Sequence, residues 1–463
     1  MEKQALIITG LEPHRVYQRQ ADDTANLTFR VVIPEGLQGR LEIRRSGSAW
    51  TAVEQGQDGG LEVTLSSVPV GKHTIHARLV AEQAVVLAEG QIGPVFVGDL
   101  WILAGQSNME GCGRLIDVDT PCEGVSCFYL GDRWAMAEEP LCWLAESNDP
   151  VHWMGFPEGM EMTEERRGQY IAAARRDRVQ GAGLGLSFGK KLLQHTGIPV
   201  GLLMTAHGGT SMDQWDAALA GEGGRSLYGA MLRVIHAAGG KVKGCLWYQG
   251  ESDTVDMPTA EQYYDKTLKW VERLRQDLND PELPFIYAQI SVVMGWPAEE
   301  PWNRVQDDQL RLENVLGRAE MVPTIDAVLA DVIHPDAGSL RDIGERMAAA
   351  ALRLVHGAAA DSSGPRLQKA VWNETRTELT LQLSGCNGKL RAVDRVFSLT
   401  LMQESERLPL TAHLGADGVS IVVKPEQPAP LDVQLWHGRG LNPTVNIRDE
   451  KGIPLPVFGP LEV

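Results

Sequence analysis

The sequence predicts an α/β protein, with a parallel sheet that carries helices on both faces and is flanked by two smaller β domains. Over residues 96–358, apolar strand-like runs alternate with runs of helical periodicity, which indicates parallel strands joined by crossover helices. Residues 1–95 and 365–463 instead contain short period-two stretches separated by Gly, Pro and Asp, as in β-sandwiches. The small and polar residues of 358–365 predict a linker. Three domains suit a chain of 463 residues.

Strands of the two outer domains follow from residue type and alternation. β-branched and aromatic residues predict a strand at 27–33, and period-two alternation predicts strands at 61–65 and 73–77. We expect this first domain to pack on the middle one or to shape its site, because it carries no visible chemistry. In the last domain the predicted strands are 379–383, 419–423 and 433–436.

The middle domain is predicted in order from its periodicity. Strands are expected at 100–104, 199–205, 242–248, 285–290 and 320–325, and helices at 185–195, 226–238, 259–278, 301–316 and 339–355. Ser226 is placed to cap one helix, and Thr259 with Gln262 forms an expected capping box. Residues 111–180 fit the alternation poorly and predict a long insertion beside the site. Within them, the charged run 164–167 is expected to be a solvated helix face.

Charge and hydropathy exclude several classes of partner. Lys and Arg number 43 against 61 Asp and Glu, a net charge of −18, so a nucleic-acid partner is not expected. No apolar run approaches the ~20 residues that span a bilayer, so no membrane partner is expected. The start of the chain lacks the pattern of a signal peptide, so a cytoplasmic location is expected; a secreted or periplasmic one fits if the chain is a trimmed form.

The cysteines predict free thiols. None of the spacings is C-x-x-C, so a zinc site is not expected. Four of the six lie within 112–142, which leaves disulfides open in an oxidising compartment. The six are Cys112, Cys122, Cys127, Cys142, Cys245 and Cys386.

One stretch, 98–109, presents a serine at the end of a predicted buried strand. Gly105 breaks the strand, and the polar residues Gln106, Ser107 and Asn108 follow directly. The strand fixes the backbone while the turn projects the hydroxyl, which suits a nucleophile. An ordinary strand-to-turn transition fits this stretch equally well when it is considered alone.

Three more polar loops decide between these interpretations. They follow predicted strands or precede the last helix, at 207–211, 249–253 and 331–335. A serine needs an adjacent base, histidine is a base near neutral pH, and an aspartate orients it. Asp331 and His334 are three residues apart, so the carboxylate can bind Nδ1 while Nε2 faces the serine.

Acyl transfer also needs donors for the oxyanion of the tetrahedral intermediate. The amide of Ser107, a glycine amide of the pair Gly208 and Gly209, and the side-chain amide of Gln249 are the predicted donors.

The four loops resemble a known superfamily. The segments G-Q-S-N-M, H-G-G-T-S-M-D-Q-W, W-Y-Q-G-E-S-D and D-V-I-H-P resemble, in order and wording, the blocks of the SGNH hydrolases. They most resemble the sialate O-acetylesterase group, which shares its pattern with acetyl-xylan esterases. The similarity covers 96–355, and 442–446 with 452–456 also resemble the C-terminal end of that group.

That resemblance implies a flavodoxin-like catalytic domain and a role for each loop. It implies Ser107 as nucleophile, His334 as base and Asp331 as its orienting partner. It also implies Gly209, or Gly208, and Gln249 as oxyanion donors, where many relatives carry an asparagine in place of the glutamine. Glu251 is expected to orient its loop. His207 departs from the pattern, because relatives often have an aromatic residue there.

Plainer roles stay open for several of these residues. Asp331 and His334 also fit a helix cap and a surface histidine. Gln249 and Glu251 also fit a pinned loop, and Asp326 competes as third member of the triad. A metal site at His207 is not expected, since no second ligand stands at suitable spacing. Four tryptophans could stack on a sugar, of which Trp215 is the one expected near the site: Trp215, Trp247, Trp296 and Trp302.

The sequence therefore predicts a metal-independent serine esterase without cofactor that removes acetyl groups from sugar hydroxyls. An acetyl-xylan esterase, an esterase for another small acyl ester and a catalytically inactive carbohydrate-binding protein remain alternatives. The sugar, the hydroxyl position and the oligomeric state are not predicted.

Overall fold

A parallel sheet organises the middle of the molecule in the computed structural model, which describes residues 4–53, 60–153, 163–176, 178–357 and 361–463. Its strand order is β12-β11-β14-β9-β15-β16-β17, and all of these pairings are parallel except that of β12 with β11. The bounds are β9 (Val86–Gly105), β11 (Val125–Tyr129), β12 (Arg133–Met136), β14 (Val200–Met204), β15 (Gly244–Tyr248), β16 (Phe285–Ala288) and β17 (Ala319–Val322). The five strands predicted for this sheet are therefore all found.

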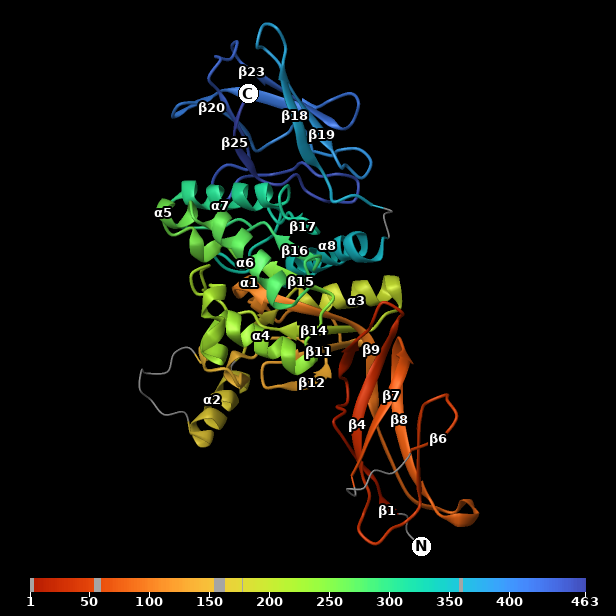
Figure 1. Cartoon of the computed structure of the whole chain (residues 1–463). Coiled ribbons are helices and arrows are strands. Elements are labelled where there is room, and N and C mark those ends of the chain that lie inside the picture. The colour runs from red at the N-terminus through yellow and green to blue at the C-terminus, as the bar shows by residue number, and fades with distance from the viewer. Residues whose placement is uncertain (1–3, 54–59, 154–162, 177, 358–360) are drawn as a thin grey trace.

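Helices cover both faces of this sheet (Figure 1). On one face, Trp101 of β9 packs edge-on against Phe188 of α3, with ring centroids 5.1 Å apart. On the other face, Trp247 of β15 packs against Trp270 of α6 at 4.3 Å. The predicted mixed α/β class is confirmed. The helices are α3 (Gly185–Thr196), α4 (Leu227–Ala238), α6 (Tyr263–Asp277), α7 (Glu299–Leu312) and α8 (Ala337–His356), with short α1 (Ser107–Glu110) and α5 (Met257–Ala260).

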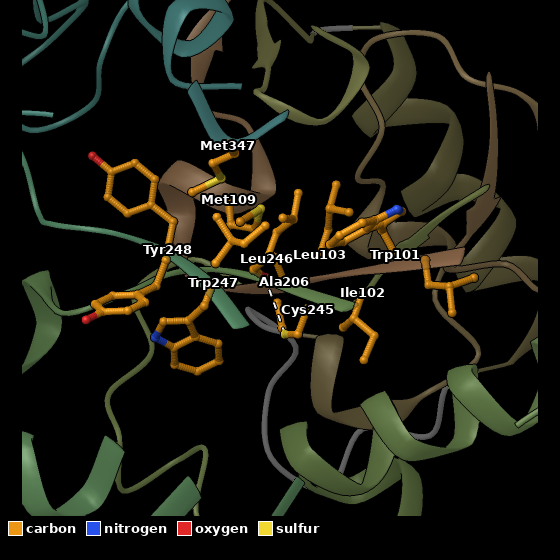
Figure 2. Packing of buried hydrophobic residues seen from close by; sticks show 14 of the residues in the cluster. Trp101, Ile102, Leu103, Met109, Ala206, Cys245, Leu246, Trp247, Tyr248 and Met347 are labelled. Carbon is orange, nitrogen blue, oxygen red and sulfur yellow. Dashed lines mark hydrogen bonds between the residues drawn. The ribbon is translucent and has the colours of Figure 1, made fainter. Parts of the chain in front are cut away.

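The centre of the sheet is fully buried, and this explains the unbroken apolar runs of its strands. Figure 2 shows Trp101, Leu103, Leu246 and Trp247 from two neighbouring strands within one apolar cluster, together with Met347 of α8. All five side chains are at most 1% exposed. Burial on this scale stabilises the sheet by roughly 1.5–3 kcal/mol per large side chain.

One helix start differs from the prediction. The expected capping box of Thr259 and Gln262 is wrong, because Asp256 caps α5 by accepting from the Thr259 amide at 2.8 Å. Gln262 instead donates to the Pro258 carbonyl, and the continuous helix expected over 259–278 is divided into α5 and α6. The predicted cap at Ser226 is confirmed, since its hydroxyl accepts from the Gly229 amide.

The expected boundary at 95/96 falls inside a single strand. The first part of β9 pairs antiparallel with β8, up to Val97 opposite Gly71, and its later residues pair with β14 and β15 from Asp99 onward. The N-terminal β structure and the central sheet therefore share a strand instead of a linker. The ion pair between Arg19 and Asp99, at 2.8 Å, adds a buried contact at this junction.

The N-terminal β structure consists of two facing groups of strands. β2, β4 and β7 form one sheet, and β5 and β8 pair beside β9 in the other. Alternate residues of β4, including Leu27, Phe29 and Val31, are at most 2% exposed and form the core between them. The bounds are β1 (Gln4–Ala5), β2 (Ile7–Thr9), β3 (Val16–Gln18), β4 (Thr24–Val32), β5 (Arg40–Arg45), β6 (Thr51–Ala52), β7 (Gly60–Pro69) and β8 (Gly71–Val80).

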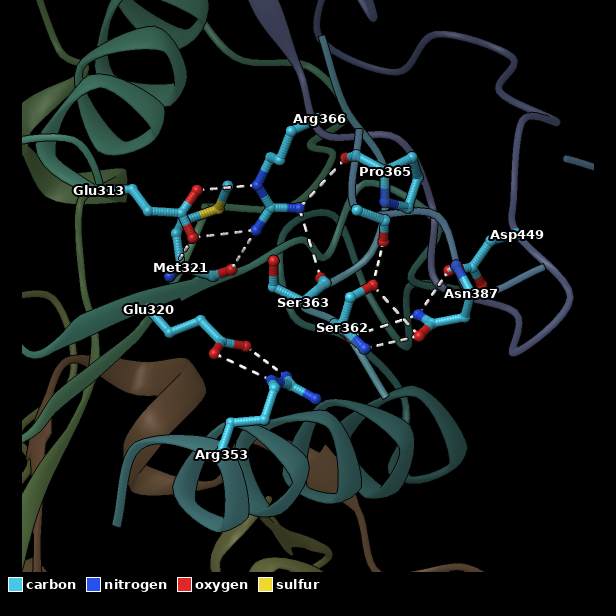
Figure 3. Close-up of polar contacts among 11 residues, drawn as sticks. Glu313, Glu320, Met321, Arg353, Ser362, Ser363, Pro365, Arg366, Asn387 and Asp449 are labelled. Atoms are coloured by element: carbon cyan, nitrogen blue, oxygen red, sulfur yellow. Dashed lines mark hydrogen bonds and ion pairs between the residues drawn. The ribbon is translucent and has the colours of Figure 1, made fainter. Parts of the chain in front are cut away.

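The C-terminal β structure has two four-stranded sheets, β18-β19-β23-β22 and β21-β20-β24-β25, around a core that includes Leu381, Ile421 and Leu435. Figure 3 shows how it is fixed to the α/β part: Arg366 of β18 bonds Glu313 at 2.8 Å and the Met321 carbonyl at 2.8 Å. The bounds are β18 (Arg366–Trp372), β19 (Leu379–Ser384), β20 (Leu399–Gln403), β21 (Glu406–Leu408), β22 (Leu410–Leu414), β23 (Ser420–Pro425), β24 (Gln434–His437) and β25 (Phe458–Glu462).

The expected insertion at 111–180 contains part of the main sheet. Val125–Tyr129 forms β11, which pairs in parallel with β14, so this buried pentapeptide is a strand that was not predicted. The charged run at 164–167 opens α2 (Glu164–Arg176), which has no buried residue and thus matches the expected solvated helix. Two short strands, β10 (Gly113–Arg114) and β13 (Gln180–Ala182), close the region by pairing with each other.

All six cysteines are free, as predicted. Burial raises the pKa of the Cys127 and Cys245 thiols, which are fully enclosed in the core.

Candidate active site

Three of the four polar loops leave the same edge of the sheet. β9, β14 and β15 are neighbours, and Tyr248 pairs in register with Gly105 where β9 ends. Gly105 has φ +133°, and a Cβ there would lie 2.2 Å from the Tyr248 carbonyl oxygen, so only glycine fits this turn. The loops that begin at Gln106, His207 and Gln249 therefore lie side by side.

The residues on either side of Ser107 bind the loop that follows β15. The Gln106 side-chain oxygen accepts from the amides of Gly250, at 3.4 Å, and Ser252, at 3.2 Å. The Asn108 side chain donates to the carboxylate of Glu251 at 2.6 Å. Both predicted supporting residues, Gln106 and Asn108, are buried and join two loops of the site. Glu251 anchors its loop, as the sequence suggested.

Glu110, three residues after Ser107, binds the loop on the other side, a role that was not predicted. Its carboxylate accepts from the Gly208 amide at 2.7 Å. Burial raises its pKa, an effect that the Gly208 bond and the charges of Arg178 and His334 oppose. The sequence marks Glu110 only by its position, three residues after Ser107 at the end of α1. The short helix α1 thus holds both neighbouring loops around the serine.

Ser107 is the first residue of α1 and is 8% exposed. The amide of the first residue in a helix has no partner within the helix. In the described part of the chain, the Ser107 amide donates to no protein acceptor. A Cβ placed on Gly208 would lie 3.3 Å from the Cβ of Ser107, so the serine and the glycine pair are in contact.

Asp331 and His334 form the pair that the sequence predicted. Asp331 Oδ2 lies 2.7 Å from His334 Nδ1, while Oδ1 accepts from the amides of Ile333 and His334. Burial is the largest effect on Asp331 and acts to raise its pKa, but these bonds together outweigh it and lower the pKa. One carboxylate therefore closes the turn with one oxygen and orients the imidazole with the other.

His334 lies at the same edge as Ser107. The Val332 carbonyl, two residues before His334, accepts from the Met294 amide in the loop after β16, so this turn lies at the carboxyl ends of the sheet strands. Within the described residues no hydrogen bond joins the Ser107 hydroxyl to His334. Such bonds often tighten only when substrate binds. The structure thus brings the predicted base near the serine loop, with Nε2 free of the aspartate.

Asp326, the competing aspartate, is engaged elsewhere. Its carboxylate binds Arg346 at 2.7 Å and Arg448 at 2.9 Å. A carboxylate neutralised by two guanidinium groups is a structural ion pair, and it does not contact His334.

The predicted oxyanion role of Gln249 is not what the structure shows. Its side-chain nitrogen donates to the Thr210 carbonyl at 3.1 Å and to the carboxylate of Asp253, so both amide hydrogens are used. Asp253 also accepts from the Met212 amide, and burial raises its pKa to about 6. Gln249 therefore ties two loops together, which is the plainer role that its sequence position also allowed.

The amides of Gly208 and Gly209 differ in whether they have a hydrogen-bond partner. The Gly208 amide is bound to Glu110, whereas the Gly209 amide has no acceptor among the described residues. Gly209 is exposed and has φ +70°, a conformation that glycine adopts without strain. Of the two glycines, Gly209 is the one with a free donor.

Trp215, the tryptophan expected near the site, lies behind the glycine loop and is buried, so it is not available to stack on a sugar. It is 0% exposed and packs edge-on against Trp247 and Trp270 in the core. Its indole nitrogen donates to the Thr210 hydroxyl at 3.0 Å, so it supports the glycine loop from below. Trp247 and Trp302 are also buried, which leaves Trp296 as the half-buried member of the four.

His207 is paired with a second buried histidine that the sequence did not indicate. The Nδ1 atoms of His207 and His152 lie 3.0 Å apart, and the rings stack at 5.1 Å. Burial lowers the pKa of His152 to about 3 and that of His207 to about 4. Both rings are therefore neutral at pH 7, and one donates to the other.

This pair should make the fold sensitive to acid. An unfolded histidine takes up a proton near pH 6.5, whereas the folded pair resists protonation until about pH 4, so the free energy of unfolding should fall as pH drops through this window. Urea unfolding of the wild type and of His152→Gln at pH 7.5 and pH 5 tests it. The variant keeps a hydrogen-bonding side chain, and its unfolding should take up about one proton fewer than unfolding of the wild type. An identical pH dependence of the free energy of unfolding in the two proteins would contradict the prediction.

No group of three His, Cys, Asp or Glu side chains in the described ranges is arranged to hold a metal ion. Among the helices of those ranges, none is long and apolar enough to cross a membrane.

Comparison with known proteins assigns the chain to a class of ester hydrolases. Residues 97–353 match the family described as SASA, carbohydrate esterase, sialic acid-specific acetylesterase. The chain belongs to this carbohydrate esterase family.

Two relatives illustrate the similarity. The chain is 30% identical over 233 residues to the probable carbohydrate esterase At4g34215 of Arabidopsis thaliana, a match that covers 48% of this chain and 79% of the relative. A crystal structure described as XAC1771, a novel carbohydrate acetylesterase from Xanthomonas citri, superposes with a TM-score of 0.66 at 22% identity and covers 97% of both chains. The fold of that protein therefore extends over the outer β parts as well.

Proposed function

We propose that this esterase removes acetyl groups from sugar hydroxyls, with Ser107 as nucleophile, His334 as base and Asp331 as the group that orients it. The observation that carries the proposal is the Asp331–His334 hydrogen bond at the edge of the sheet where the Ser107 turn is held. Membership of a carbohydrate esterase family supports the acetylated sugar as substrate.

The reaction follows from the roles of these groups. His334 Nε2 takes the proton of the Ser107 hydroxyl as its oxygen attacks the acetyl carbonyl carbon. The protonated His334 then donates that proton to the departing sugar oxygen, the carbon–oxygen bond breaks, and acetyl-Ser107 remains. A water molecule gives its proton to His334 and attacks the acetyl carbon. Acetate leaves, and Ser107 regains its proton.

Two backbone amides, those of Ser107 and Gly209, are the donors that we propose for the oxyanion. The Ser107 and Gly209 amides have no protein acceptors among the described residues, and each lies in a loop of the predicted site. Donors that are already in place stabilise the developing charge without reorganisation. Gln249 then acts on the reaction only by holding the Thr210 loop.

The finer fold assignment is a flavodoxin-like SGNH domain flanked by β-sandwich domains. Without β11 and β12, the strand order β14-β9-β15-β16-β17 corresponds to 2-1-3-4-5, the flavodoxin-like order. The proposal keeps a cytoplasmic location and the three domains 1–95, 96–358 and 365–463, with the first two joined through the shared strand β9. Ligands of such sheets bind outside the carboxyl ends of the strands, which supports a site at the edge where Ser107 lies.

Glu110 should contribute to the rate by positioning the glycine loop. Glu110→Ala removes the acceptor for the Gly208 amide and should lower kcat about ten-fold or more, because Gly209 loses its fixed position. Glu110→Gln keeps an acceptor oxygen and should restore most of kcat. Steady-state kinetics with 4-nitrophenyl acetate measures both, and equal losses in the two variants would contradict the positioning role.

Acetate release from a panel of acetylated sialosides, xylo-oligosaccharides and other acetylated sugars tests the function itself. The proposal predicts release from at least one class, and no release from any of them would refute it. A serine-directed phosphonate separates the esterase from an inactive carbohydrate-binding protein, since only the esterase should be labelled at Ser107.

A further inference from the structure

We infer that Trp296, together with Met294, Val332 and Val255, forms a platform at the mouth of the site that binds the C–H face of the sugar ring whose acetyl group is removed. These four residues are called the apolar strip below. The inference rests on the proposed function and adds to it the surface that recognises the alcohol part of the ester.

The strip is tied to the catalytic loops by two hydrogen bonds. The Met294 amide donates to the Val332 carbonyl at 2.8 Å, and Val332 is two residues before His334. The Trp296 indole nitrogen donates to the Thr254 hydroxyl at 2.8 Å. Thr254 follows the short helix Glu251–Asp253 and donates to the Glu251 carbonyl at 2.7 Å. The strip thus spans the loops after β15 and β16 and the Asp331–His334 turn.

These apolar side chains are exposed although they lie beside a polar site. Val332 is 57% exposed, Val255 54% and Met294 45%. Trp296 is half-buried and packs edge-on against the buried Trp302 at 5.7 Å, which fixes its ring. The loop is fixed further by the Val293 amide, which donates to the Leu441 carbonyl at 2.8 Å. Exposed apolar surface next to a functional site marks a place where a ligand binds.

A sugar ring fits this surface better than an acyl chain does. An acetyl group has a single methyl and needs little apolar contact, so the larger strip serves the alcohol part of the ester. A pyranose has an apolar C–H face with hydroxyls around its edge, and a rigid indole supplies contact area at low entropic cost. None of the four strip residues carries a charge. The same face is present in neutral pyranosides and in sialosides, so both are sources to compare.

The experiment compares each variant on two kinds of substrate. For acetylated xylosides and acetylated sialosides, kcat/KM is divided by kcat/KM for ethyl acetate, whose alcohol part is too small to cover the strip. In Trp296→Ala this ratio should fall about ten-fold or more, the effect of losing a stacking contact. Trp296→Phe keeps a ring and should give an intermediate ratio. Leu431→Ala is the matched control, because Leu431 is an 84% exposed apolar residue outside the site, and its ratio should match the wild type.

The outcomes separate this inference from the proposed function. A fall in the ratio for xylosides alone, or for sialosides alone, supports the platform and identifies its sugar. An unchanged ratio in Trp296→Ala for every sugar ester that the wild type cleaves overturns the platform and leaves the esterase in place. A wild type that releases acetate from ethyl acetate but from no sugar ester overturns both.

Discussion

Replacement of Ser107 by alanine should abolish acetate release, with kcat/KM on 4-nitrophenyl acetate reduced by roughly 10³-fold or more. The loss follows because no acetyl-enzyme can form, while the oxyanion donors and the substrate contacts remain. The measurements are acetate release and covalent labelling by a fluorescent serine-directed probe.

The fold of this variant should be unaffected. Ser107 makes its helix contacts through the backbone, and the side chains of Gln106, Asn108 and Glu110 hold the neighbouring loops. The Tm of Ser107→Ala should therefore lie within a few degrees of the wild type. Full residual activity in a folded variant would refute the proposed nucleophile.

Periodicity and residue type were enough to find the framework. Each of the five predicted strands of the middle sheet is present. A strand that is buried on both faces is a continuous apolar run, and such a run is easy to recognise in the sequence. Val125–Tyr129 is buried like the other strands, but it was missed because Ser126 interrupts its apolar run and the residues around it show no clear periodicity. The join at β9 was also missed, since a strand shared by two sheets leaves no linker in the sequence.

The candidate site shows where residue types stop being informative. Asp331 and His334 were predictable because three residues of separation place them in one turn. The contacts of Gln249 and Trp215 were not predictable, since a sequence does not reveal that both hydrogens of an amide are used or that an indole packs in the core. Glu110 and His152 depend on contacts between distant segments. Glu110 meets the loop after β14 at Gly208, and His152, from the segment after β12, meets the same loop at His207.

The two oxygens of Asp331 allow its structural and catalytic roles to be separated. Oδ1 closes the turn by accepting from the Ile333 and His334 amides, and Oδ2 binds His334 Nδ1. Asp331→Asn keeps an oxygen for the turn and presents an amide nitrogen to the imidazole. The imidazole then accepts at Nδ1 and carries its proton on Nε2, where it is no longer a base.

We therefore expect Asp331→Asn to lower kcat by about 10²–10⁴-fold with little change in Tm. Asp331→Ala loses both functions and should lower kcat and Tm together, which makes it the matched comparison. Because the pKa of Asp331 is lowered, its carboxylate should stay ionised and keep orienting the imidazole at acidic pH. Steady-state kinetics across pH with thermal unfolding measures these effects. An Asp331→Asn enzyme within about three-fold of the wild-type kcat would show that the carboxylate only closes the turn, and the base would then have to be oriented by another group.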